Sequence, residues 1–299
     1  MRAALSGAVQ KVTERYGTAQ VAVMLDSWTQ PLLLGEQLAN PMRLWSLSKP
    51  VVAMTLLRQR EERGSGTTDL ALYLERAMRR SDNCAMRELT IKLQEETGGI
   101  AGARAAIEET VGLGGAAVEI ANAQTDTEGS VCISPTYAGL SPSFAHRRAL
   151  LAGTATWTID DAIHFVHGLQ TGVLDVSGHP SFSARVLGLM RLTKEVSDEP
   201  LAGHLTAPPT WGAGDVFAAP CWNVAYKAGW GGAQAHIPWL ASQIGSVALA
   251  GGHQLDFAVA VHPYTQPPDD DPGLTDAPQA ISLVLRALRA YLQGEQLCQ

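Results

Sequence analysis

The 299-residue sequence has little of what nucleic-acid-binding and membrane-spanning proteins depend on. Its 22 Lys and Arg residues are outnumbered by 29 Asp and Glu residues, so the formal net charge is −7. Such a chain is a poor partner for nucleic-acid phosphates or an anionic membrane surface. No apolar run approaches the ~20 residues that a membrane-spanning helix needs. Hydrophobic residues still make up 46% of the chain, enough for the core of one large domain or two interlocked smaller ones.

No two of the four cysteines stand at the spacing of a zinc site or a redox pair, so they favour free thiols. No other motif indicates a metal or an organic cofactor, and we expect none. The N-terminus has no apolar stretch followed by a small-residue cleavage site. That pattern favours a cytoplasmic protein, with a secreted protein whose signal has been removed as the alternative.

The spacing of apolar residues predicts strands near both ends of the chain and helices between them. The expected strands lie at 21–25, 31–35, 224–227, 244–250 and 255–261. The expected helices lie at 3–16, 46–62, 70–80, 84–96, 101–111, 159–169, 184–193 and 276–293. This order favours an α/β (α+β) fold, in which an antiparallel sheet flanked by the N- and C-terminal helices carries an all-helical insertion. We expect residues 1–40 and 210–299 to form the sheet domain and residues 41–209 the helical domain, with the active site in the groove between them.

The segment Trp45-Ser46-Leu47-Ser48-Lys49 contains Ser-x-x-Lys at an expected helix start. Three residues along a helix place the Ser46 hydroxyl and the Lys49 amine on one face, within hydrogen-bonding reach. A serine becomes a good nucleophile when a base takes its proton, and a lysine kept neutral by burial can be that base. The free N–H groups at a helix start suit a developing oxyanion. A helix cap beside a solvated lysine is the other interpretation, because Ser-x-x-Lys occurs about once by chance in a chain of this length.

Two further short motifs contain residues of the same chemistry. Ser81-Asp82-Asn83 falls between two expected helices, where it either faces a cleft or simply caps the helix that begins near residue 84. Lys227 lies on an expected strand, and Gly229, two residues later, lets the backbone approach a ligand closely. An exposed strand lysine is the alternative there. The chain has only five lysines, and two of them fall within these three motifs.

The three motifs, taken in order, resemble those of the penicillin-recognising serine enzymes, the class A β-lactamases and penicillin-binding proteins. They are Ser-x-x-Lys at 46–49, Ser-Asp-Asn at 81–83 and Lys-Ala-Gly at 227–229. The resemblance covers nearly the whole chain but is loose between residues 100 and 220. It implies a β-lactamase/transpeptidase-like fold and a small amide, lactam or ester substrate.

The resemblance also implies a role for each motif residue. Ser46 is then the nucleophile that forms an acyl-enzyme, Lys49 is its activating base, and Ser81 relays a proton to the leaving nitrogen. Lys227 then supplies a positive field that binds a carboxylate or polarises Ser81. The oxyanion hole is implied to consist of the backbone N–H groups of Ser46 and Trp230. The substrate-binding positions implied are Asn83, Ala228, Gly229 and Trp230.

The sequence departs from the family pattern around the substrate and in deacylation. Ala228 stands where a hydroxyl usually binds a substrate carboxylate, and the bulk of Trp230 narrows the expected cleft. Residues 117–156 contain no Glu-x-x-x-Asn, the pattern with which class A β-lactamases deacylate. Glu128 is a weak candidate for the missing base, with a solvated loop acid as the alternative interpretation. We therefore expect slow turnover of β-lactams.

Three functions remain open at this point. The first is a β-lactamase-related serine hydrolase that acts on an amide, lactam or ester. The second is a cytosolic acyltransferase or amidase of secondary metabolism. The third is a penicillin-binding or sensor-type protein that is acylated, or only binds, without turnover.

Overall fold

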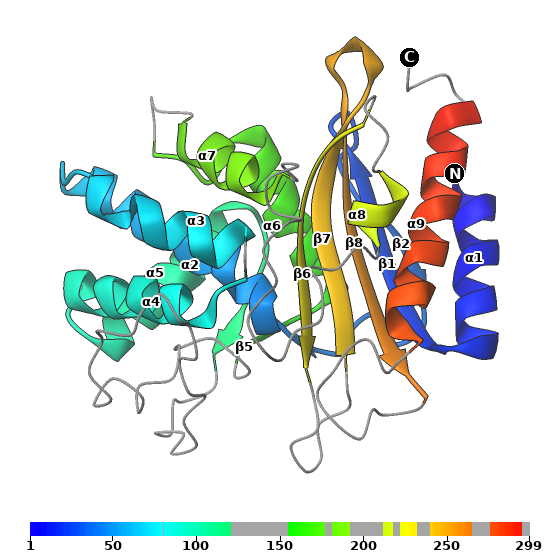
Figure 1. The fold of residues 1–299 in the computed structure, drawn as a ribbon, viewed down its shortest axis with the longest axis horizontal. Coiled ribbons are helices and arrows are strands. Elements are labelled where there is room, and N and C mark those ends of the chain that lie inside the picture. The colour runs from blue at the N-terminus through cyan, green and yellow to red at the C-terminus, as the bar shows by residue number, and fades with distance from the viewer. Residues whose placement is uncertain are drawn as a thin grey trace.

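The structure is a computed structural model that describes residues 1–79, 81–120, 155–176, 181–191, 212–217, 222–231, 240–264 and 276–294. At its centre is a five-stranded antiparallel sheet with helices on both faces (Figure 1). The α/β class and the antiparallel sheet expected from the sequence are confirmed. Among the helices described, none is both long and apolar enough to cross a bilayer.

The central sheet joins strands from both ends of the chain in the order β2-β1-β8-β7-β6. From the first edge to the last, these strands are β2 (Leu32–Gly35), β1 (Gly17–Leu25), β8 (Gln254–Pro263), β7 (Leu240–Ala248) and β6 (Asn223–Gly231). All four pairings are antiparallel. β6, β7 and β8 are longer than the predicted strands, because small or polar residues such as Gly229 and Ser242 continue the ladder beyond the apolar runs.

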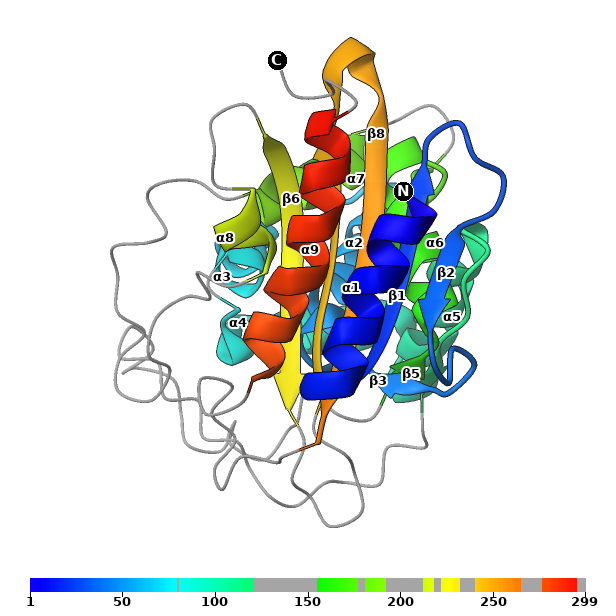
Figure 2. The ribbon, with the colours of Figure 1, turned by 90° about the vertical axis from the view of Figure 1, so that its right-hand side faces the viewer.

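The two terminal helices, α1 (Arg2–Arg15) and α9 (Ala277–Gly294), cover one face of the sheet and lie side by side across it (Figure 2). The short helix α8 (Ala213–Val216) packs against α9. Apolar side chains of the two helices and of this sheet face form one buried cluster, which includes Leu5, Val12, Phe257, Leu285 and Leu288. Burial of each such side chain stabilises the fold by roughly 1.5–3 kcal/mol.

Helices from the middle of the chain lie on the opposite face of the sheet (Figure 1). They are α2 (Ser48–Glu62), α3 (Ala71–Arg79), α4 (Asn83–Thr97), α5 (Ile100–Leu113), α6 (Ile159–Thr171) and α7 (Ser181–Met190). α6 contacts β1, β7 and β8, whereas α7 contacts β6. α2 packs on α7, α4 and α5, so it stands in the middle of this layer.

Helix α6 shows how local sequence sets the ends of these elements. The Thr158 hydroxyl accepts a hydrogen bond from the Asp161 N–H, and the Asp161 carboxylate accepts one from the Thr158 N–H. This reciprocal capping box satisfies two backbone donors at the helix start. The helix ends at Gly172, whose φ of 74° is a left-handed conformation that glycine adopts without strain.

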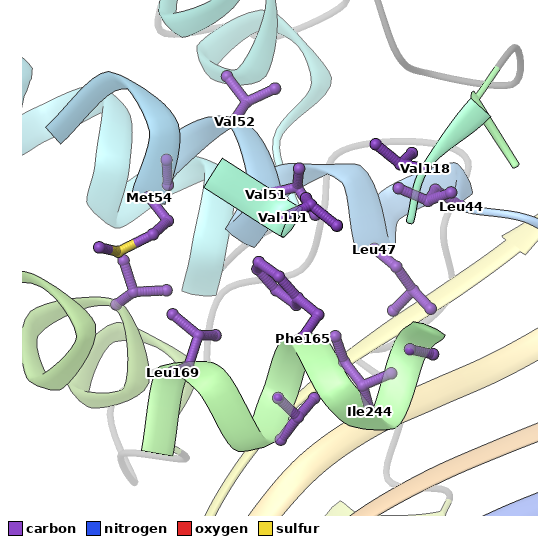
Figure 3. Packing of buried hydrophobic residues seen from close by; sticks show 14 of the residues in the cluster. Leu44, Leu47, Val51, Val52, Met54, Val111, Val118, Phe165, Leu169 and Ile244 are labelled. Carbon is purple, nitrogen blue, oxygen red and sulfur yellow. The ribbon is translucent and has the colours of Figure 1, made fainter. Parts of the chain in front are cut away.

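A second buried cluster fills the space between the sheet and the helical layer. Figure 3 shows Leu47 and Val51 near Phe165 of α6, with Ile244 of β7 beside them. Each of these four side chains is at most 1% exposed. The start of α2 is therefore anchored in the core that joins the two layers.

The packing of β7 can be tested at Gly245. A Cβ at this position would overlap the Ala225 carbonyl oxygen and stand 2.7 Å from the Phe257 ring. Gly245→Ala is therefore expected to lower the free energy of unfolding by roughly 1–3 kcal/mol, measured by urea denaturation. Gly7→Ala is the matched control, because a Cβ at this exposed position in α1 meets nothing within 4 Å and alanine favours the helix by up to ~1 kcal/mol. Unchanged stability of Gly245→Ala would contradict the register of β6, β7 and β8.

Candidate active site

Ser46 lies in a single 3-10 turn, Trp45–Leu47, that runs directly into α2. Trp45 has a φ of 46°, in the left-handed region that bulky residues rarely adopt. The Ser48 hydroxyl donates a 2.6 Å hydrogen bond to the Trp45 carbonyl oxygen and so ties the strained residue to the first turn of α2. Strained backbone of this kind is concentrated at functional sites.

A small three-stranded sheet holds the Ser46 turn from its N-terminal side. Its strands, in order, are β3 (Met42–Arg43), β5 (Ala155–Trp157) and β4 (Glu119–Ile120). The Leu44 N–H donates to the Ala155 carbonyl oxygen at 3.0 Å, which continues this pairing up to the turn. Leu44 and Leu47 are fully buried on either side of the half-buried Ser46.

Strand β6 passes directly beside the Ser46 turn at Gly229. A Cβ at Gly229 would stand 3.0 Å from the Leu44 carbonyl oxygen and 3.2 Å from the Leu47 backbone nitrogen. Any larger residue would push the strand away from the turn. The glycine of the Lys-Ala-Gly motif therefore sets how closely the sheet edge approaches Ser46.

Four side chains from the three sequence motifs form an unbroken chain of polar contacts. The Lys49 Nζ lies 2.6 Å from the Ser46 Oγ, one turn away on the same helix start. The Ser81 hydroxyl donates to the Ser46 Oγ at 3.1 Å, and the Lys227 Nζ donates to the Ser81 Oγ at 2.8 Å. The Lys227 Nζ also donates to the Ala228 carbonyl oxygen at 3.1 Å. The fold thus brings together residues that are up to 181 positions apart in the sequence.

Ser81 occupies the turn between α3 and α4 and has a φ of 52°, also in the left-handed region. The next residue, Asp82, caps α4, because one of its carboxylate oxygens accepts the Ala85 N–H at 3.1 Å. The other carboxylate oxygen accepts a hydrogen bond from the Arg76 Nε at 3.0 Å. The turn that presents Ser81 is therefore held by a helix cap and an ion pair.

Burial controls the charge of both lysines. Lys49 is 2% exposed and Lys227 is 5% exposed. Desolvation lowers the pKa of Lys49 to about 7, although the negative charge of Asp82 acts in the opposite direction. Desolvation, together with the charge of Lys49, holds the pKa of Lys227 well below its usual value. At neutral pH a large fraction of Lys49 is therefore the neutral amine, which can accept a proton.

The remaining predicted site residues are described only in part. Asn83 begins α4, two residues after Ser81, and Trp230 lies in β6, the strand that contacts the Ser46 turn. Ala228 is 4% exposed, and its methyl group is buried. Glu128, the weak candidate for the deacylating base, lies outside the described residues.

Sequence reasoning missed two features of the site. Arg76 bonds Asp82 across the α3–α4 turn, but no sequence pattern marks an arginine six residues before an aspartate as its partner. The left-handed backbone of Trp45 also carries no sequence signal, because tryptophan is among the residues least expected in that conformation.

A separate cavity of about 270 Å³ lies between α6, α7 and the ends of β6, β7 and β8. Its polar lining includes Gln170, Ser246 and Gln254, and none of the predicted site residues borders it. It is therefore not part of the Ser46 site. Within the described parts of the chain, no three His, Cys, Asp or Glu side chains are grouped so that they could hold a metal ion.

The low pKa of Lys49 predicts a stability effect with a definite sign. The pKa of Lys49 is about 7 in the folded protein and ~10.4 in the unfolded chain. Between these two pH values the unfolded chain therefore binds more protons than the folded protein. The contribution of Lys49 to the free energy of unfolding rises with pH over this range. Lys49→Met is therefore expected to raise the melting temperature. Its gain should be largest below pH 7 and should shrink toward pH 10. Lys11→Met, at an exposed position, is the control, and a pH-independent gain for Lys49→Met would contradict the buried amine.

Comparison with known proteins gives a fold but no sequence relative. No family model matches the sequence, and no curated protein matches it. The TLA-3 extended-spectrum β-lactamase is 13% identical with a TM-score of 0.62, covering 97% of this chain and 98% of its own. A variant of the last common ancestor of Gram-negative class A β-lactamases is 18% identical with a TM-score of 0.62, covering 98% of this chain and 99% of its own. A β-lactamase from Xanthomonas campestris is 14% identical with a TM-score of 0.59, covering 97% of each chain. The chain therefore has the fold of the class A β-lactamases.

Proposed function

We propose that the protein is a β-lactamase-like serine hydrolase that forms an acyl-enzyme at Ser46 on an amide, lactam or ester. The observation that carries the proposal is the chain of contacts from Lys49 through Ser46 and Ser81 to Lys227. A hydroxyl with a buried amine at 2.6 Å has the geometry of a nucleophile and its base. The fold shared with class A β-lactamases supports the same reaction class.

In the proposed acylation, the neutral amine of Lys49 accepts the Ser46 proton as the Ser46 Oγ bonds to the substrate carbonyl carbon. The carbonyl oxygen becomes an oxyanion, for which the proposed donors are the backbone N–H groups of Ser46 and Trp230. When the oxyanion collapses, the bond between the carbonyl carbon and the leaving nitrogen or oxygen breaks. The proton taken by Lys49 then has to return to that leaving atom. Ser81 bridges Ser46 and Lys227, so its hydroxyl is placed to give its own proton to the leaving atom and to receive the returned proton in exchange.

The proposed role of Lys227 follows from its position. Its amine donates to Ser81, so it polarises the hydroxyl that serves the leaving group. Ala228 offers only a buried methyl group, which leaves Lys227 as the one side chain of this motif that could meet a substrate carboxylate. Proposed substrate contacts at Asn83, Gly229 and Trp230 complete the site.

Deacylation needs a base for water, and Glu128 is the weak candidate from the sequence. Losing a general base costs ~10²–10⁴-fold in the step that it serves. We therefore propose slow turnover of β-lactams, with acylation faster than deacylation.

Intact-mass measurement after incubation with a penicillin or a p-nitrophenyl ester tests the proposed nucleophile. We expect an adduct on Ser46 that accumulates in the wild type and then decays as product forms, and no adduct in Ser46→Ala. Turnover without a lasting adduct supports the hydrolase, whereas a persistent adduct supports the sensor-type protein. Product formed with an added amine or alcohol in place of water supports the acyltransferase. Normal labelling of Ser46→Ala would place the chemistry elsewhere.

The pH dependence of labelling tests the proposed base. Because Lys49 must be neutral to accept the Ser46 proton, and its pKa is about 7, the acylation rate is expected to rise with pH and to level off above a midpoint near pH 7. A solvated lysine would instead give a midpoint near pH 10. Stopped-flow acylation by a chromogenic cephalosporin between pH 5 and 9 measures the midpoint. A rate that does not change across this range would contradict a Lys49 base with a pKa near 7.

A further inference from the structure

Arg76 holds the backbone and the side chain of Asp82 at the same time. Its Nε donates to an Asp82 carboxylate oxygen at 3.0 Å, and its carbonyl oxygen accepts the Asp82 N–H at 3.2 Å. The Arg76 side chain is 13% exposed and the Asp82 side chain 10%, so the ion pair is largely shielded from water. A hydrogen bond between charged groups in such a setting contributes more than one between exposed groups.

This pairing closes the turn that carries Ser81. The backbone bond and the ion pair join the last turn of α3 to the residue that caps α4, and Ser81 lies between them in a left-handed conformation. A serine in that conformation is strained by about 1–3 kcal/mol and stays there only when its surroundings hold it. The Arg76–Asp82 pair is therefore placed to hold the Ser81 hydroxyl toward Ser46 and Lys227.

The same pair also acts on the base by its charge. The negative charge of Asp82 raises the pKa of Lys49, and the charge of Lys49 in turn lowers the pKa of Lys227. The guanidinium of Arg76 lies against Asp82 and opposes its field. Removal of Arg76 strengthens the field of Asp82 at Lys49 and so raises the pKa of Lys49. Removal of the Asp82 charge lowers the pKa of Lys49.

We propose that Arg76 is a positioning residue that acts through Asp82, holding the Ser81 hydroxyl between Ser46 and Lys227 and offsetting the charge that Asp82 exerts on Lys49. The inference rests on the proposed acylation of Ser46. Arg76 lies outside the three motifs. In the contacts described, its side chain does not touch the side chains of Ser46, Lys49, Ser81 and Lys227.

Two substitutions break the same hydrogen bond but change the charge in opposite directions. Arg76→Gln removes the positive charge. Asp82→Asn removes the negative charge, while its amide oxygen can still cap α4. Arg76→Lys restores the positive charge without the Nε geometry. Arg286→Gln is the matched control, because it removes a guanidinium paired with Asp215 on the far face of the sheet.

We expect both Arg76→Gln and Asp82→Asn to slow acylation of Ser46 by a chromogenic cephalosporin by roughly tenfold or more. The midpoint of the pH–rate profile should move to higher pH in Arg76→Gln and to lower pH in Asp82→Asn. Arg76→Lys should return the midpoint toward the wild type while the plateau rate stays reduced. A merely structural role would slow both variants without opposite displacements of the midpoint.

A second readout does not need activity. The chain has five lysines, so ε-¹³C-lysine NMR can follow the titration of Lys49 directly, with Lys49→Arg to assign its resonance. Opposite displacements of the Lys49 titration in Arg76→Gln and Asp82→Asn support the inference. If the wild type is not acylated, the proposed function fails, and the NMR titrations still decide the inference. Identical Lys49 titrations in the wild type, Arg76→Gln and Asp82→Asn would overturn it, as would unchanged acylation in both variants.

Discussion

The burial of the Lys49 amine is the constraint on which the rest of the site depends. An ammonium group removed from water costs several kcal/mol unless a partner stabilises it or it loses its proton. Lys49 is packed at the start of α2 with its amine 2.6 Å from the Ser46 hydroxyl, and the charge of Asp82 only partly offsets its desolvation. Lys227 is buried nearby and is affected by the charge of Lys49. The two amines therefore titrate as a coupled pair, and the pair as a whole carries less charge than two solvated lysines.

The fold meets this constraint by placing the site where three elements meet. The start of α2, the α3–α4 turn and the edge strand β6 each contribute one short motif. The face of β6 lies against the Ser46 turn at Gly229. Gly229 permits that approach, and the core around Leu47 keeps the turn in place.

Local features of the site could be predicted from the sequence, and long-range ones only through resemblance. The spacing of Ser46 and Lys49 follows from helix geometry alone. The contact between Ser46 and Ser81 depends on how α3 and α4 pack on α2, which no local pattern encodes. The sequence predicts too short a strand around Lys227, because Gly229 and Gly231 have a low propensity for strands. Their pairing with β7 extends β6 over both glycines despite this low propensity. The strained Trp45 and the partner of Asp82 could not be predicted, since each is set by surrounding packing rather than by residue preference.

The pairing of β1 with β8 determines the order in which the chain can fold. Gly17 is paired with Pro263, so β1, which is synthesised early, cannot complete its pairing until β8 has been synthesised. Helices α2 to α5 are close in sequence and can form early, because local contacts have a small loop-closure cost. Until β8 arrives, the β1–β2 hairpin has an unpaired, apolar edge, which is the kind of surface that aggregates. We therefore expect completion of the sheet by the C-terminal strands to be the slow, concentration-sensitive stage of folding. This stage would also bring Lys227 to a helical layer that already contains Ser46.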